Sequence, residues 1–257
     1  MKDHRLLAPW FLDRRSEPVL RLAAAGDVEI AARPGPGDQT ESLAPIHRAI
    51  ADGVAGAVAA GERPVALLGD CCQTIGVLAG LQRGGLAPTL VWIDAHGDFN
   101  TWETTPSGFL GGMPLAMITG RGDQRMMTAV GLSPLADERV VLSDGRDLDP
   151  GEVDLVRASR LHHVEDLRDL AAALPPGPLY LHFDRDVIDS SEAPAFLYPV
   201  KGGPSVEATR AALAAIEATG RVVAISMTLG WDMAKDADGR TKAAVRRAFS
   251  PLASGWN

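Results

Sequence analysis

The sequence predicts an α/β fold with three layers, in which a mostly parallel central sheet is covered by helices on both faces. Two observations predict it. Short apolar runs rich in β-formers alternate along the chain with alanine-rich stretches whose apolar residues recur at helical spacing. The chain also has 257 residues, of which 46% are hydrophobic, and this suffices for one sizeable core. We therefore predict a single domain over residues 1–257.

Strands and helices are predicted in alternation from residue 65 onward. The first strand ends in a polar loop, and the helix after it closes on Gly84 and Gly85, which suit a C-cap. A later helix has Ser205 as its N-cap and Glu207 in its first turn. The predicted strands are 65–70, 89–98, 139–147, 178–189 and 221–231, and the predicted helices are 73–85, 153–174 (mostly helical), 205–219 and 241–249.

Charge and composition exclude several classes of protein. The formal net charge is −8 and no basic block stands out, which argues against a nucleic-acid partner. No apolar run approaches the roughly 20 residues of a membrane-spanning helix, and residues 1–18 are typical of mature protein rather than of a signal peptide. Cys71 and Cys72 are adjacent, a spacing that rarely forms an unstrained disulfide. Free thiols in a reducing, cytoplasmic setting are therefore expected.

Polar residues that can bind metals or substrates fall at the carboxyl ends of the predicted strands. In a parallel sheet these ends meet at one edge, and ligands bind there. We expect this edge to collect Asp70, Cys71, Asp94, His96, Asp98, Arg146, Asp147, Asp149, Asp184, Asp186 and Asp189.

The strings DAHGD and FDRD predict a metal centre. Asp94, His96 and Asp98 occupy alternate positions, and such side chains point the same way in an extended segment. Asp184 and Asp186 repeat the spacing. Carboxylates crowded in this way repel one another severely unless cations lie between them. Carboxylates with one imidazole suit Mn²⁺, and shared carboxylates favour a pair of ions, which makes hydroxide available near neutral pH.

The strings LGDCC, DAHGD and HFDRDVIDS, in this order, resemble the motifs of the arginase/agmatinase family, the ureohydrolases. The resemblance covers roughly residues 65–231. It implies the arginase-like three-layer fold, a binuclear manganese centre and hydrolysis of a guanidine-type C–N bond. It also implies that Asp94 and Asp184 bridge the two ions, that Cys71 and Asp98 complete one, and that His96 and Asp186 complete the other. Asp98 is further expected to hold the nucleophile and to shuttle its proton.

The resemblance extends to the substrate pocket. NTWETTPSG is similar to the arginase loop that binds the α-carboxylate, with Asn100, Thr105 and Ser107 as the polar contacts. RDLDPGE is similar to the segment that meets the α-amino group, which carries over to Asp149 with Glu152 nearby. Hydroxyl and amide donors suit a carboxylate, and acids suit an ammonium. A guanidino α-amino acid is therefore the expected small-molecule partner, although loop formation alone also explains the first three residues.

Cys71 departs from the family, because the family's string has a ligating His there. A thiolate ligand is soft and shifts the preference toward Zn²⁺, Fe²⁺ or Co²⁺. The alternative is that Cys71 is a small buried residue and that one metal is lost. Cys72 is expected to pack.

Two further departures concern catalysis and the guanidinium. Gly111 stands where arginases carry a catalytic His, and His182 is either its substitute or a packed side chain. A late acidic residue of arginases is replaced by Thr228 or Leu229. A less basic guanidine, such as that of Nω-hydroxy-L-arginine, needs less charge complement. We therefore predict hydrolysis of this substrate to ornithine plus urea or hydroxyurea.

Other functions stay open at this point. One is ordinary arginase, agmatinase or formimino-amino-acid hydrolase activity, and another is a catalytically inactive metal-binding scaffold. The resemblance also implies a homo-oligomer, although the C-terminal residues 250–257 show no assembly element. Trp102 and Phe109 are expected to pack, and Asp189, Tyr198 and Trp231 receive no role.

Overall fold

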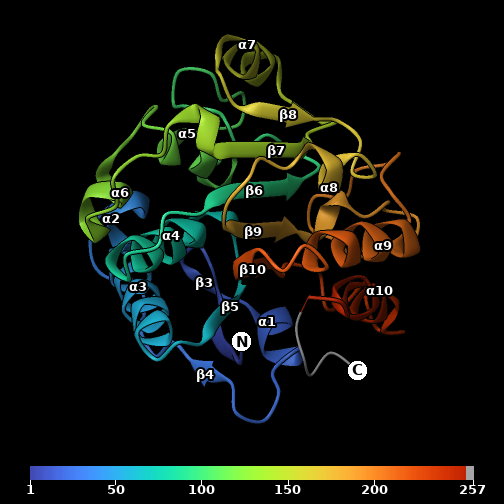
Figure 1. Ribbon diagram of the computed structural model, residues 1–257, viewed down its shortest axis with the longest axis horizontal. Helices are drawn as coiled ribbons and strands as arrows, with labels where there is room; N and C mark the ends of the chain where they lie inside the picture. The colour runs from blue at the N-terminus through green and yellow to red at the C-terminus, as the bar shows by residue number, and fades with distance from the viewer. Residues whose placement is uncertain (253–257) are drawn as a thin grey trace.

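The computed structural model describes residues 1–252, so the last five residues of the C-terminal segment discussed above lie outside the described residues. Over this range, eight strands form one sheet in which every pairing is parallel (Figure 1). In spatial order the strands are β4 (Val28–Glu29), β1 (Asp3–Ala8), β5 (Arg63–Leu68), β10 (Val222–Thr228), β9 (Leu179–Asp184), β6 (Thr89–Asp94), β7 (Val140–Asp144) and β8 (His162–Val164). The predicted parallel α/β architecture is confirmed.

Helices cover both faces of the sheet. On one face lie α2 (Gln39–Ser42), α3 (Ala44–Ala59), α4 (Thr74–Arg83), α5 (Pro114–Ile118) and α6 (Arg125–Val130), and on the other lie α1 (Glu17–Arg21), α8 (Leu170–Ala173), α9 (Val206–Glu217) and α10 (Arg240–Phe249) (Figure 1). Helix α7 (Pro150–Ala158) lies at the β8 end of the sheet, and β2 (Trp10–Phe11) and β3 (Arg14–Arg15) form a separate antiparallel pair.

Each central strand contributes to two apolar cores. In β6, Leu90 and Trp92 belong to the core under α3 and α4, whereas Val91 and Ile93 belong to the core under α9 and α10. All four side chains are fully buried. Burial of both faces explains why these strands are continuous apolar runs, and it confines polar residues to the strand ends.

The sequence-based element assignment was right for most of the chain after residue 65. Ser205 caps α9 as predicted, because its hydroxyl accepts from the Ala208 N–H at 3.1 Å. The stretch 153–174 was predicted to be mostly helical, and this was wrong over residues 159–169, because α7 ends at Ala158, α8 begins at Leu170, and His162–Val164 form the edge strand β8. An edge strand is short and only half covered, so its polar side chains carry no apolar signal. The elements before residue 63 were not predicted, and neither were helices α5 and α6.

A buried histidine under α4 makes stability depend on pH. His47, in α3, is fully buried, and both of its ring nitrogens lack a hydrogen-bond partner among the described residues. Its backbone oxygen also faces Gly76, where an added Cβ would lie 2.7 Å away, so α3 and α4 approach closely at this point. Burial lowers the pKa of His47 from 6.5 to about 4. The unfolded chain therefore takes up a proton below pH 6.5 that the folded chain refuses until about pH 4.

We expect His47→Leu to raise the free energy of unfolding by about 1–3 kcal/mol at neutral pH, because two unsatisfied buried nitrogens are removed. As the pH falls from 6.5 to about 4, protonation of His47 in the unfolded chain should lower the wild-type free energy of unfolding by roughly 1.4 kcal/mol per pH unit. The variant should lack this pH dependence. Urea unfolding at pH 7 and pH 5 measures both effects, with the exposed His162→Leu as the control. Equal slopes for His47→Leu and wild type would contradict the prediction.

Because all strands of the main sheet are parallel, their carboxyl ends lie at one edge of it. No helix within residues 1–252 combines the length and apolarity needed to cross a membrane.

Candidate metal centre

A pocket of about 490 Å³ opens at the carboxyl ends of β5, β6 and β9. All of the predicted metal ligands and substrate-binding residues line it: Cys71, Asp94, His96, Asp98, Asn100, Thr105, Ser107, Asp149, Glu152, Asp184 and Asp186. Phe11, Phe109, Gly111, Arg185 and Tyr198 are further parts of its wall. The strand-end rule therefore predicted most of this lining, but Arg146 and Asp189, which were expected at the same edge, are not part of it.

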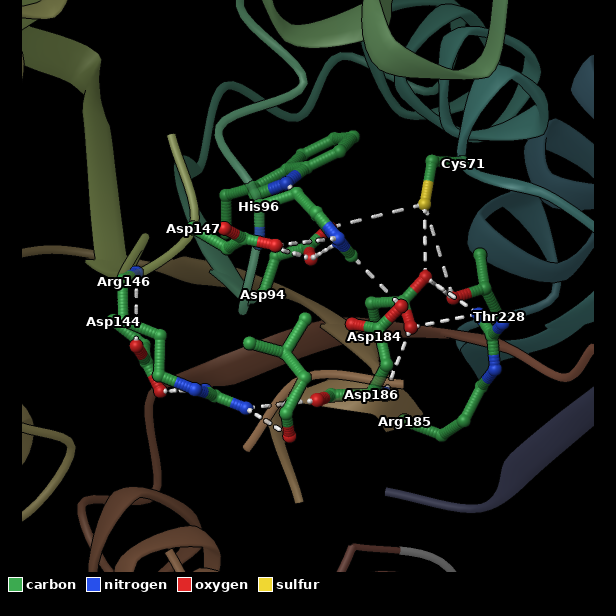
Figure 2. Close-up of polar contacts among 12 residues, drawn as sticks. Cys71, Asp94, His96, Asp144, Arg146, Asp147, Asp184, Arg185, Asp186 and Thr228 are labelled. Atoms are coloured by element: carbon green, nitrogen blue, oxygen red, sulfur yellow. Dashed lines mark hydrogen bonds and ion pairs between the residues drawn. The ribbon is translucent and has the colours of Figure 1, made fainter. Parts of the chain in front are cut away.

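Within residues 1–252, two groups of potential ligands have donor atoms that all lie within 4.8 Å of one another. One group is Cys71, Asp94 and Asp98, and the other is Asp94, His96 and Asp186. Both groups contain Asp94, which suits a shared carboxylate. In the second group, His96 Nδ1 lies 3.4 Å from an oxygen of Asp94 and 3.5 Å from one of Asp186 (Figure 2).

Turns, rather than extended backbone, bring these side chains together. Strand β6 ends at Asp94, and Asp98 has a φ of 48°, so the expected alternation of 94, 96 and 98 along a strand was wrong. Asp94 instead accepts the His96 N–H at 2.8 Å. Asp184 accepts the Asp186 N–H at 3.0 Å in the same way. In both motifs the first carboxylate folds the following residues back toward the pocket.

The residues present fit divalent cations. Asp98 Oδ2 and Asp186 Oδ1 are buried and have no hydrogen-bond partner among the described residues. Burial, and then the neighbouring carboxylates, raise the pKa values of Asp98 and Asp186 well above normal. Burial lowers the pKa of His96, but the surrounding carboxylates outweigh it and raise the pKa to about 11. The carboxylate cluster therefore favours positive charge next to it, which hard divalent ions supply.

Cys71 lies among the carboxylates. It begins the short turn Cys71–Gln73 between β5 and α4, and its Sγ is 3.1 Å from Asp184 Oδ2 and 4.0 Å from Asp94 Oδ2. Burial, followed by the carboxylates, raises the pKa of its thiol. Cys72 points elsewhere, with its Sγ 3.6 Å from the Leu110 carbonyl, and it packs as expected.

Arg185 is the residue that sequence interpretation missed. Its buried guanidinium donates from Nη1 to both oxygens of Asp184, at 2.7 and 2.8 Å, and from Nε to the Gly230 carbonyl at 2.9 Å. Burial alone would raise the pKa of Asp184, but Arg185 and other donors lower it to about 2. Thr228 also donates to Asp184. The signal was present in the string FDRD, where a cation stands between two predicted ligands at a strand end.

The predicted substrate loop is organised by its own polar groups. Asn100 is buried and donates to Asp149 Oδ2 at 2.9 Å. Thr105 and Ser107 accept from the backbone of Gly108 and Phe109 at 3.1 and 3.2 Å. Loop formation thus accounts for part of their chemistry, and their substrate contacts stay a prediction.

Glu152 has a clear structural part in this site. Its carboxylate is buried and accepts the backbone N–H groups of Phe99 at 2.7 Å and Asp149 at 2.8 Å. It thereby ties the segment after Asp98 to the first turn of α7. Burial raises its pKa to about 7.

The position of the missing imidazole is filled by an aromatic ring. A Cβ on Gly111 would collide with the ring of Phe109. That ring stacks 6.2 Å from Phe11 and lies 5.3 Å from Tyr198, and all three line the pocket. Phe109 therefore packs as expected and also shapes the wall. Trp102 is 43% exposed and is not part of the lining, so the expectation that it packs was wrong.

His182 does not replace that imidazole. It is fully buried away from the pocket, its Nδ1 is 3.0 Å from Thr74 Oγ1 and 2.8 Å from Ser226 Oγ, and its ring lies 4.0 Å from Trp92. Burial lowers its pKa to about 3, which keeps the ring neutral. The packed interpretation is the one that the structure supports. Thr228 and Leu229 are buried and place no carboxylate on the last strand.

Comparisons with known proteins agree with this geometry. A model of the arginase family matches residues 6–243. The arginase of Bacillus caldovelox is 36% identical over 177 residues, covering 63% of this chain and 59% of that protein. The N(omega)-hydroxy-L-arginine amidinohydrolase of Streptomyces lavendulae is 33% identical over 163 residues, covering 62% and 58%. The matched part thus spans less than two thirds of the length of these curated relatives.

Solved structures extend the likeness over nearly the whole chain. The native arginase of Bacillus caldovelox at pH 5.6 superposes with a TM-score of 0.84 and 25% identity, covering 98% of each chain. The agmatine ureohydrolase of Thermoplasma volcanium superposes with a TM-score of 0.68 and 16% identity, covering 98% of this chain and 88% of that one, which shows a shared fold.

We expect Asp94→Asn to abolish retention of metal, because both donor groups contain Asp94. Asp98→Asn and Asp186→Asn should each remove one group and keep the other. Metal content of dialysed protein, measured by mass spectrometry, distinguishes these cases, and circular dichroism confirms folding. Equal metal loss in all three variants would refute the two-group arrangement.

Proposed function

We propose that this chain, which belongs to the arginase family, hydrolyses the guanidino C–N bond of an arginine-like α-amino acid. The observation that supports it is the convergence of Cys71 and five acidic or imidazole side chains on one wall of a pocket that also carries Asn100, Thr105, Ser107 and Asp149. The pocket thus combines a place for divalent ions with donors and an acid for the two ends of an α-amino acid.

Two divalent ions, with Mn²⁺ the expected metal, would be held by Cys71, Asp94, Asp98, His96, Asp184 and Asp186. Bound there, the ions would lower the pKa of a water molecule so that a nucleophile is available near neutral pH.

Asp98 is the group that we assign to proton transfer. Its Oδ2 is buried, lines the pocket and lacks a partner among the described residues, so it is free to accept a proton from the attacking water. It can return that proton to the leaving amine. Since Gly111 and His182 offer no imidazole at the pocket, the same carboxylate serves both steps.

The loop residues of the pocket lining suit the α-amino acid group. Thr105 and Ser107 have hydroxyls 3.5 Å apart, and both line the pocket. Hydroxyl donors at this spacing suit the two oxygens of a carboxylate. Asp149, fixed by Asn100, suits the α-ammonium group. The aromatic wall of Phe11, Phe109 and Tyr198 is left for the apolar carbons between.

L-Arginine is the first substrate to consider, since the relatives named above include an arginase with the higher identity. This modifies the preference for Nω-hydroxy-L-arginine drawn from the sequence. A specific observation keeps the hydroxylated substrate as the second candidate: Arg185 adds positive charge to the pocket wall, and Thr228 and Leu229 supply no compensating carboxylate. Homo-oligomer formation also stays a prediction.

We expect Mn²⁺-loaded protein to release ornithine from L-arginine or from its Nω-hydroxylated form, with agmatine cleaved at least about tenfold less efficiently because it lacks the carboxylate. Chromatography of ornithine, urea and hydroxyurea gives kcat/KM for each substrate. The Asp98→Asn variant is the control for metal-dependent background. Metal-loaded protein that releases no product from any of the three would favour the inactive scaffold.

We expect Ser107→Ala to raise KM for the α-amino acid by about tenfold, because a hydrogen bond to a charged group contributes about 1.5 kcal/mol. The KM for agmatine, which has no carboxylate, should not change. Steady-state kinetics with both substrates provides the test, and the neighbouring Thr101→Ala, which lies outside the pocket lining, is the matched control. Unchanged affinity for the amino acid would remove the carboxylate assignment.

A further inference from the structure

We propose that Arg185 is an internal cation of the metal centre that makes the two ion positions unequal. The group Asp94, His96 and Asp186 would bind its ion tightly, and the group Cys71, Asp94 and Asp98 would bind weakly. The inference rests on the proposed metal centre and concerns one residue that distinguishes this chain within it.

Arg185 is held firmly against the carboxylate cluster. Its side chain is 3% exposed, and its guanidinium carbon lies 5.6 Å from the centre of the Phe196 ring. The Nε bond to the Gly230 carbonyl fixes the plane of the guanidinium, and Nη1 contacts both oxygens of Asp184. A buried guanidinium keeps its charge, and these contacts restrict its orientation.

Asp184 is saturated by these contacts. Its Oδ1 accepts from Arg185 and Asp186, and its Oδ2 accepts from Arg185, Thr228 and Cys71. A carboxylate offers about four lone-pair positions, so little capacity is left for two cations. Among the described residues, Asp184 belongs to neither group of mutually close ligand atoms. Its expected role as a bridge between the ions is thus opposed by an arginine that occupies it.

The pairing of Arg185 with Asp184 should weaken ion binding more at the Cys71 group than at the His96 group. Asp184 is 3.1 Å from the sulfur of Cys71, and Thr228, which donates to the same carboxylate, is 3.8 Å from that sulfur. Figure 2 shows the Arg185 guanidinium on this side, next to Thr228, with His96 on the far side of Asp184. An ion at the Cys71 group would therefore find the adjacent carboxylate, Asp184, already paired with Arg185, whereas the His96 group has Asp186 as its further carboxylate.

Arg185 also compensates part of the negative charge of the carboxylates. Four carboxylates face one another in this pocket, and one divalent ion with one guanidinium compensates three of the four charges. A cation that belongs to the chain compensates carboxylate charge whether or not metal is abundant. The Cys71 half of the centre can therefore stand without its ion.

The test compares Mn²⁺ binding by the whole chain with binding by two charge-removing variants, Arg185→Met and Arg185→Gln. Equilibrium dialysis gives the two dissociation constants, and electron paramagnetic resonance separates isolated from paired Mn²⁺. We expect wild type to bind a second ion at least about tenfold more weakly than the first, and both variants to bind the second ion about tenfold to a hundredfold more tightly. Arg185→Gln keeps a donor for Gly230, which protects against simple misfolding.

Two controls isolate the charge of Arg185. Arg185→Lys keeps the charge and should keep the two affinities unequal. Arg121→Met removes a different bidentate pair, with Asp137 at 2.7 Å, away from the pocket lining, and should leave both affinities unchanged. Melting temperatures confirm that each variant is folded.

Each outcome separates this inference from the proposed function. Equal affinities in wild type, or a second affinity that neither charge-removing variant strengthens, would overturn the role of Arg185 and leave the hydrolase proposal standing. Wild-type protein that binds no Mn²⁺ under any condition would overturn both. Paired-ion spectra that appear in Arg185→Met at metal levels where wild type shows isolated ions would support the inference.

Discussion

The repulsion among four buried carboxylates is the constraint on which the rest of the site depends. Asp94 ends β6 and Asp184 ends the adjacent strand β9, and Asp98 and Asp186 lie shortly after them, so the sheet itself brings the four together. Away from bulk water this repulsion is poorly screened, and burial adds to it. The pKa values of Asp94, Asp98 and Asp186 are all raised, and that of Asp184 is lowered only because Arg185 and other donors outweigh burial. The pocket is therefore a place that requires cations.

The fold can sustain such a site because its polar groups are confined to one edge. Both faces of the sheet are buried, and consecutive residues such as Val91 and Trp92 enter different cores. Most side chains that line the pocket then come from strand ends or from the loops after them. Glu152 secures one of these loops by accepting two backbone N–H groups. The apolar layers hold the strand ends in place, and short hydrogen bonds set the direction of each ligand.

Local patterns predicted what depends on local physics. Helix α9 was predicted from Ser205 and its apolar spacing, and the strand ends were predicted from apolar runs followed by Asp94 and Asp184. The geometry of DAHGD was not, since alternation presumes extended backbone whereas Asp98 has a φ of 48°. Pairings between distant segments, such as Asn100 with Asp149, leave no periodic signal. Nor does the sequence show which way Arg185 points, and that direction decides its role.

Arg185 links two properties that look separate. It pairs with Asp184, where it would compete with an ion, and it also lines the pocket that the proposed guanidine substrate would enter. A fully charged guanidinium meets this arginine with no carboxylate from Thr228 or Leu229 to offset it, whereas a less basic guanidine meets less repulsion. The proposed weak binding at the Cys71 group and the proposed tolerance of a less basic substrate would therefore have the same electrostatic origin. In this proposal one fixed cation, Arg185, both compensates part of the carboxylate charge and disfavours a fully charged guanidinium.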